Sequence, residues 1–136
     1  MSGIFIYTGI TVRDLDRSIK FYTEIMGMKL LAKIKNPYTN GEFAELGSAE
    51  NEIPVLELNW YEDQSEYRSG DELDHLGFLV GDAKKELERL RSLGVEIAKE
   101  PYESSNHIVF FAKDPDGIWL EIFSKKHKDA FPVKIN

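Results

Sequence analysis

The chain of 136 residues contains no cysteine and no long apolar segment. The missing cysteine excludes disulfides, thiolate metal sites and thiol nucleophiles. No segment approaches the roughly 20 apolar residues that a membrane-spanning helix requires, and the opening MSGIFIY lacks the basic region of a signal peptide. The simplest expectation is a cytoplasmic protein.

Positive charge is also scarce, because 17 basic residues stand against 24 acidic ones and the formal net charge is −7. Such a balance opposes non-specific attraction to nucleic acid or to an anionic membrane. We therefore expect neither of these as a partner.

The sequence does contain an internal repeat. The segment YTGITVRD (7–14) aligns with HLGFLVGD (75–82), so that Gly9, Val12 and Asp14 recur as Gly77, Val80 and Asp82. In each copy a helical pattern of apolar residues follows the aspartate, which is a favoured N-cap residue. Gly27 and Gly94 stand where these helices should end. Short strand patterns come next, so both copies predict the order strand, helix, strand, strand, strand.

The repeat sets the expected domain organisation. We expect a single domain over residues 4–124, built from one module at 4–60 and a second at 73–124. The polar segment 61–72 is interpreted as the inter-module linker, and 125–136 as a polar tail.

Each module places a glutamate in the middle of its last apolar strand. VLELNW (55–60) matches IWLEIFS (118–124), with Glu57 and Glu121 at equivalent positions. Because side chains alternate along a strand, Glu121 shares a face with Trp119 and Phe123. Two interpretations remain open: glutamates on a solvated strand face, or glutamates kept for a site.

The first strand of each module offers partners for these glutamates. His75 is predicted to open the strand of the second module, and Tyr7 takes the equivalent place in the first. If the modules pack around a pseudo-two-fold axis, Tyr7, Glu57, His75 and Glu121 converge. Carboxylates and an imidazole suit one divalent first-row metal ion, such as Zn, Ni, Mn, Co or Fe. A hydrogen-bonded structural role is the alternative for His75.

The order of elements, the helix DLDRSIKFYTEIMGMKL and the ending FAKDPDGIWLEI resemble the vicinal-oxygen-chelate superfamily of glyoxalases, bleomycin resistance proteins and dioxygenases. The closest resemblance is to lactoylglutathione lyases. It implies an α+β fold in which two tandem βαβββ modules form a cupped, eight-stranded mixed sheet. It also implies a homodimer and one divalent metal ion on the concave side, with Glu57, His75 and Glu121 as ligands and Tyr7 at the fourth ligand position. The modules could pair within the chain or across the dimer.

Two positions depart from the pattern of the family. Tyr7 stands where histidine or glutamine is usual, and a neutral phenol is a poor metal ligand. It could bind as a phenolate, act through a water molecule or close one side of the cup. Thr11 stands where glutathione-using members have arginine, and Arg13 on the same strand face is the nearest substitute. Thr11, Arg13, Trp119 and Phe123 are the expected residues of the substrate pocket.

The resemblance implies a metal-dependent lyase or isomerase that removes a proton next to a metal-polarised carbonyl of a small α-hydroxycarbonyl or thiohemiacetal. Glu121 is the expected base, since Trp119 and Phe123 would exclude water from it, and Glu57 is the alternative. Two other functions stay open. One is a non-catalytic binding protein that sequesters a ligand, as in bleomycin resistance, and the other is a metal-dependent enzyme that opens an epoxide.

Overall fold

The chain divides into two units that repeat one order of elements. The computed structural model describes residues 3–103 and 106–126, and the units cover Met1–Ser69 and Gly70–Asn136. The boundary between them falls inside the predicted linker 61–72. The grouping of both modules into one domain stays a prediction, and most of the predicted tail lies outside the described residues.

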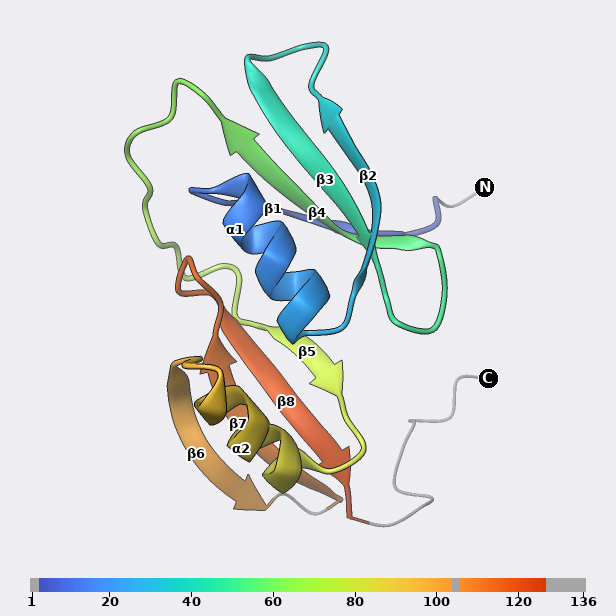
Figure 1. Ribbon diagram of the computed structural model, residues 1–136, viewed down its shortest axis with the longest axis vertical. Coiled ribbons are helices and arrows are strands. Elements are labelled where there is room, and N and C mark those ends of the chain that lie inside the picture. Colours follow the sequence, from blue (N-terminus) through green and yellow to red (C-terminus); the bar gives the residue numbers. More distant parts are fainter. Residues whose placement is uncertain (1–2, 104–105, 127–136) are drawn as a thin grey trace. The chain divides into compact units, whose positions relative to one another are not determined.

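Unit 1 consists of a mixed four-stranded sheet and one helical segment (Figure 1). Its elements are β1 (Thr8–Thr11), α1 (Leu15–Lys20), η1 (Phe21–Ile25), β2 (Lys29–Lys35), β3 (Gly41–Gly47) and β4 (Pro54–Tyr61). The strand order is β1-β4-β3-β2, with β1 parallel to β4 and the other pairs antiparallel. α1 packs against β3 and β4.

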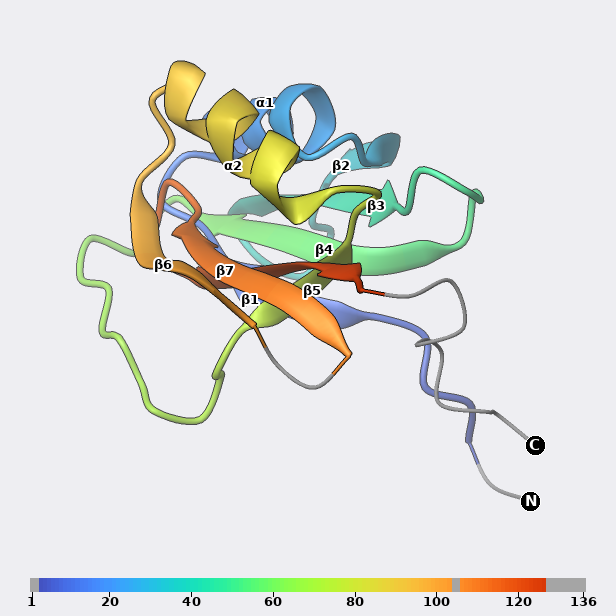
Figure 2. The same cartoon turned by 90° about the horizontal axis from the view of Figure 1, so that it is seen from below.

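Unit 2 repeats this arrangement with β5 (Leu76–Leu79), α2 (Ala83–Ser92), β6 (Ile97–Glu103), β7 (His107–Lys113) and β8 (Trp119–Lys125). The strand order is β5-β8-β7-β6, again with only the first pair parallel. α2 lies over one face of its sheet and packs against β7 and β8 (Figure 2). These observations confirm the α+β class and the two βαβββ modules. The eight strands form two four-stranded sheets, and their pairing into one cup stays a prediction.

Both main helices begin and end where the sequence predicts. The carboxylate of Asp14 accepts a hydrogen bond from Arg17 N at 2.9 Å, and that of Asp82 accepts from Lys84 N and Lys85 N at 3.0 and 3.1 Å. These contacts satisfy amide groups that have no partner inside a helix. Gly27 and Gly94, which follow the helices, both have φ of 76°, a conformation that glycine adopts without a Cβ penalty.

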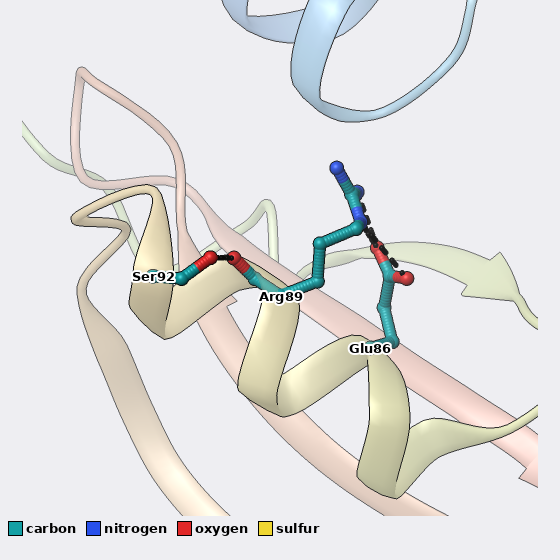
Figure 3. Close-up of polar contacts among 3 residues, drawn as sticks. All are labelled: Glu86, Arg89 and Ser92. Atoms are coloured by element: carbon teal, nitrogen blue, oxygen red, sulfur yellow. Dashed lines mark hydrogen bonds and ion pairs between the residues drawn. The ribbon is translucent and has the colours of Figure 1, made fainter.

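Polar side chains of α2 form hydrogen bonds within the helix (Figure 3). Arg89 Nε donates to Glu86 Oε1 at 3.1 Å, and this hydrogen bond is the main cause of the raised pKa of Arg89. Ser92 Oγ donates to the backbone oxygen of Arg89 at 2.7 Å in the last turn. None of the helices in the described ranges is long and apolar enough to span a bilayer.

The first helix differs from its prediction in its second half. It continues from α1 into the π-helical turn η1, in which Met26 N donates to Phe21 O at 3.0 Å. The wider turn buries the adjacent rings of Phe21 and Tyr22, whose centroids lie 5.1 Å apart in an edge-on contact. A regular 3.6-residue period does not predict this insertion.

One face of each sheet is buried under its helix and the other is open. In unit 1, Ile10, Leu56 and Leu58 are buried, whereas Glu57 between the two leucines is only half-buried. In unit 2, Leu120 and Ile122 are fully buried on either side of the half-buried Glu121. Strand alternation therefore places both glutamates on the face that is opposite to the helix.

Candidate functional site

The open face of unit 2 brings His75 and Glu121 together. β5 runs parallel to β8 with Gly77 opposite Glu121, and His75 lies two residues before Gly77, on the same face. His75 Nε2 is 2.7 Å from Glu121 Oε2, with side chains that are 34% and 27% exposed. The predicted pairing of these residues is thus present, although β5 begins at Leu76, one residue after His75.

The second ring nitrogen of His75 is also occupied. Nδ1 lies 2.7 Å from Oδ1 of Asp74, the preceding residue. The imidazole is therefore held between two carboxylates on opposite sides of the ring. Sequence reasoning missed Asp74, although an acidic residue next to a candidate ligand was a visible signal.

Aromatic rings surround this histidine–glutamate pair. Phe111 of β7 is the register partner of Glu121. Its ring centroid lies 5.6 Å from that of His75 and 5.5 Å from that of Trp119. Phe123 contacts the ring of His107 edge-on at 5.4 Å. Trp119 and Phe123 were predicted pocket residues, whereas Phe111 was missed. Pairing the residues of the two strands outward from the DPDG turn would have placed Phe111 opposite Glu121.

The open face of unit 1 has the same register but different side chains. Gly9 of β1 pairs with Glu57, as Gly77 pairs with Glu121. A Cβ atom on Gly9 would lie 3.4 Å from Asn59 Nδ2 and 4.0 Å from Glu57 Oε1, so glycine leaves room beside the carboxylate. The cross-strand partner of Glu57 is Glu45, a second carboxylate that sequence reasoning missed.

Tyr7 occupies the position in unit 1 that His75 occupies in unit 2. It lies one residue before β1, and 42% of it is exposed. Within the described part of unit 1, no hydrogen bond joins its hydroxyl to Glu57, and no ion pair engages either Glu57 or Glu45. The predicted tyrosine–glutamate pair therefore shares a sheet face without direct contact.

The remaining predicted pocket residues lie at the end of β1. Thr11 is the last residue of the strand and is exposed. The guanidinium carbon of Arg13 lies 4.7 Å from the ring centroid of Tyr67, a cation–π contact with the predicted linker. A surface pocket of about 320 Å³ in unit 1 contains none of the predicted site residues; its lining is Thr39, Asn40, Tyr61, Glu62, Asp63 and Gln64.

The donor chemistry of these residues fits a divalent metal ion, although neither unit, over its described residues, contains a group of three such donors. Two donors bound to one zinc ion lie roughly 3 to 3.5 Å apart. The 2.7 Å separation of His75 Nε2 and Glu121 Oε2 would need to open by less than about 1 Å to reach this spacing. Half-exposed oxygen and imidazole ligands are those that zinc and neighbouring first-row metals accept.

Comparison with known proteins identifies the family of the chain. Residues 4–122 match the model of the Glyoxalase/Bleomycin resistance protein/Dioxygenase superfamily. The chain is 35% identical over 124 residues to the lactoylglutathione lyase of Salmonella typhimurium, covering 89% of this chain and 92% of that protein. It is 33% identical over 132 residues to a probable lactoylglutathione lyase of Vibrio parahaemolyticus, covering 95% and 96%.

A solved structure supports the same assignment. The trypanothione-dependent glyoxalase I of Leishmania major superposes with a TM-score of 0.76 at 35% identity, over 90% of this chain and 87% of that one. The chain therefore belongs to the glyoxalase/bleomycin resistance protein/dioxygenase superfamily, and within it is a lactoylglutathione-lyase-like enzyme.

Proposed function

We propose that the chain is a metal-dependent lyase of the glyoxalase type that acts on a small α-hydroxycarbonyl or thiohemiacetal. The observation that carries this proposal is the contact between His75 and Glu121 on the open face of unit 2, with 2.7 Å between Nε2 and Oε2. The similarity to lactoylglutathione lyases supports the reaction class.

Three residues are the proposed ligands of one divalent metal ion: Glu57, His75 and Glu121. The equal registers of Gly9 with Glu57 and of Gly77 with Glu121 support treating the glutamates as equivalent ligands. The proposal requires two modules to combine, either within one chain or in a homodimer. Tyr7 is proposed to border the metal rather than to bind it.

The bound metal would act as a Lewis acid that polarises the substrate carbonyl. Glu121 would take the proton from the adjacent carbon and return it to the neighbouring position. Phe111 and Trp119 lie beside it and would exclude water from the transfer. Glu57 is the alternative base, because it occupies the equivalent place in the repeat.

The deciding experiment combines metal analysis with an isomerisation assay on the hemithioacetal of methylglyoxal. Wild-type protein should retain a first-row divalent ion and lose turnover on chelation. His75→Ala and Glu121→Gln should both lose metal. Glu88→Gln removes an exposed carboxylate of α2 and is the matched control. Unchanged metal content in His75→Ala and Glu121→Gln would refute the proposal.

The thiol of the substrate is proposed to differ from glutathione. Thr11 stands where the glutathione-using relatives are expected to have arginine, and the similar enzyme of Leishmania major is trypanothione-dependent. Thr11→Arg should lower KM for the glutathione hemithioacetal severalfold with little change in kcat, because arginine binds carboxylates tightly. A higher KM in the variant would contradict this assignment.

A ligand-sequestering role is the second candidate, favoured by the aromatic wall of Phe111 and Trp119 on the open face of unit 2. Flat rings of this kind bind apolar or aromatic ligands without a metal. Ligand binding that persists in a chelator, together with no turnover in the metal-loaded protein, would select this role over the enzyme.

A further inference from the structure

Asp74 holds one nitrogen of His75 while the other faces Glu121. The Nδ1–Oδ1 and Nε2–Oε2 distances are both 2.7 Å. We propose that Asp74 is a positioning residue that fixes the ring of His75 so that Nε2 is presented to the metal. This inference rests on the proposed function and extends it by one residue outside the ligand set.

The chemistry of imidazole explains why the contact between Asp74 and Nδ1 of His75 would favour metal binding through Nε2. When Nε2 donates its lone pair to a metal, the neutral ring carries its proton on Nδ1. A carboxylate can only accept hydrogen bonds, so Asp74 is suited to receive that proton. Such an acceptor selects the tautomer and the ring orientation of a metal-binding histidine.

The backbone explains how neighbouring residues can make this contact. Consecutive side chains on a strand point to opposite faces, but β5 begins only at Leu76. Asp74 therefore lies outside the regular alternation, and its side chain can turn toward the ring that follows it. The edge-on contact of His75 with Phe111, at 5.6 Å and 83°, restricts the ring from another side.

The repeat shows that this arrangement accompanies the imidazole. The residue that precedes Tyr7, at the position equivalent to Asp74, is Ile6, which cannot accept a hydrogen bond. At the position before the first-strand site residue, a carboxylate is thus present only in the module that has the histidine. The Asp74 side chain is 90% exposed. Its removal therefore leaves no buried polar group without a partner, and we expect the substitution to change metal binding rather than folding.

The test measures the affinity for Zn²⁺ and Co²⁺ by competition with a chromophoric chelator in four proteins besides wild type. Asp74→Ala removes the acceptor and should weaken binding about 10- to 100-fold. Asp74→Asn keeps an acceptor oxygen and should recover part of the loss. Asp71→Ala removes another exposed charge, three residues away, and should stay within about twofold of wild type. His75→Ala should lose binding altogether.

A second readout reports on the ring directly. In the zinc-loaded wild type, the Nδ1 proton of ¹⁵N-labelled His75 should exchange slowly enough with water to be seen by NMR, and in Asp74→Ala it should not. Wild-type affinity in Asp74→Ala, with binding lost in His75→Ala, overturns the role of Asp74 and leaves the proposed function standing. Equal affinities in wild type and His75→Ala overturn both.

Discussion

The two modules share a backbone plan and differ in the side chains of their open faces. In both, a glycine of the first strand pairs with the glutamate of the last one. The register partner of Glu121 is Phe111, whereas that of Glu57 is Glu45. Glu121 contacts an imidazole, but Glu57 has no such partner within the described residues of its unit.

Under the proposed function, this difference predicts different roles for the two modules. The second module provides a ring nitrogen, a carboxylate and aromatic walls, which suit metal anchoring and a sheltered proton transfer. The first provides carboxylates on a more polar face. Four comparisons of variants probe the difference between the modules, from the largest expected effect to the smallest.

The exchange of each glutamate for glutamine should separate their roles. Glu121→Gln should bind metal more weakly, and when enough metal is added to overcome this loss its kcat should still be lower by about 10²- to 10⁴-fold, the usual contribution of a general base. Glu57→Gln should mainly weaken metal binding and lower kcat less. Steady-state kinetics over a metal titration make the comparison, and the opposite ranking would assign the base to Glu57.

Histidine in place of Tyr7 should make the first module resemble the second. Four-ligand zinc sites bind with about 10–16 kcal/mol, or about 3 kcal/mol per ligand. If the new ligand contributes only half of this, about 1.5 kcal/mol, the affinity changes about tenfold. Tyr7→His should therefore tighten zinc binding by at least that factor.

The matched control for this change is Tyr7→Phe, which removes only the hydroxyl. Its zinc affinity should stay within about twofold of wild type, because Tyr7 is proposed not to bind the metal. A large loss in Tyr7→Phe would identify Tyr7 as a phenolate ligand.

The helix caps allow the same comparison for stability. Removing an N-cap carboxylate costs about 0.5–2 kcal/mol. Asp82→Ala should lie higher in this range than Asp14→Ala, because Asp82 accepts two backbone hydrogen bonds and Asp14 accepts one. Urea unfolding measures both variants, and each Asp→Asn variant, which retains a capping oxygen, should stay near wild type.

Glu45→Gln should have the smallest effect. Like charges directly opposite each other on neighbouring strands destabilise a sheet by about 0.2–1 kcal/mol. Relief of the repulsion between Glu45 and Glu57 should therefore raise the free energy of unfolding of the metal-free protein by up to that amount.

Glu42→Gln is the control on the same strand. The pKa of Lys33 is raised mainly by its hydrogen bond to Asp16 and least by the charge of Glu42, so removal of the Glu42 charge should leave stability unchanged or lower it slightly. Equal responses of the two variants in urea unfolding would show that the Glu45–Glu57 pairing has no energetic consequence.

The helix ends were predicted from the sequence because they depend on residues that are close together in the chain. Asp14, Asp82, Gly27 and Gly94 act through their immediate neighbours, so their capping roles follow from the order of residues alone. The repeat aligned strands that are distant in the chain and so led to the expectation that His75 and Glu121 belong to one site; they lie 2.7 Å apart, and their role as metal ligands stays a prediction.

Features that depend on an exact pairing or an inserted residue were missed. η1 adds a residue to one helical turn, which a periodic apolar pattern does not register. Phe111 and Glu45 join the open faces only through the cross-strand register. The contact of Asp74 with His75 depends on both residues preceding the regular strand, which begins at Leu76, whereas a period-two pattern places neighbouring side chains on opposite faces.

The paired glycines, Gly9 and Gly77, have a consequence for how such a protein can evolve. Each lies opposite a glutamate in the same register and adds no side chain of its own to the open face of its sheet. After a duplication, a point substitution at the position before either first strand, such as Tyr7 or His75, can alter the chemistry of one half without repacking the backbone. Under the proposed function, the residue before the first strand of one copy can change while the sheets of both copies stay the same.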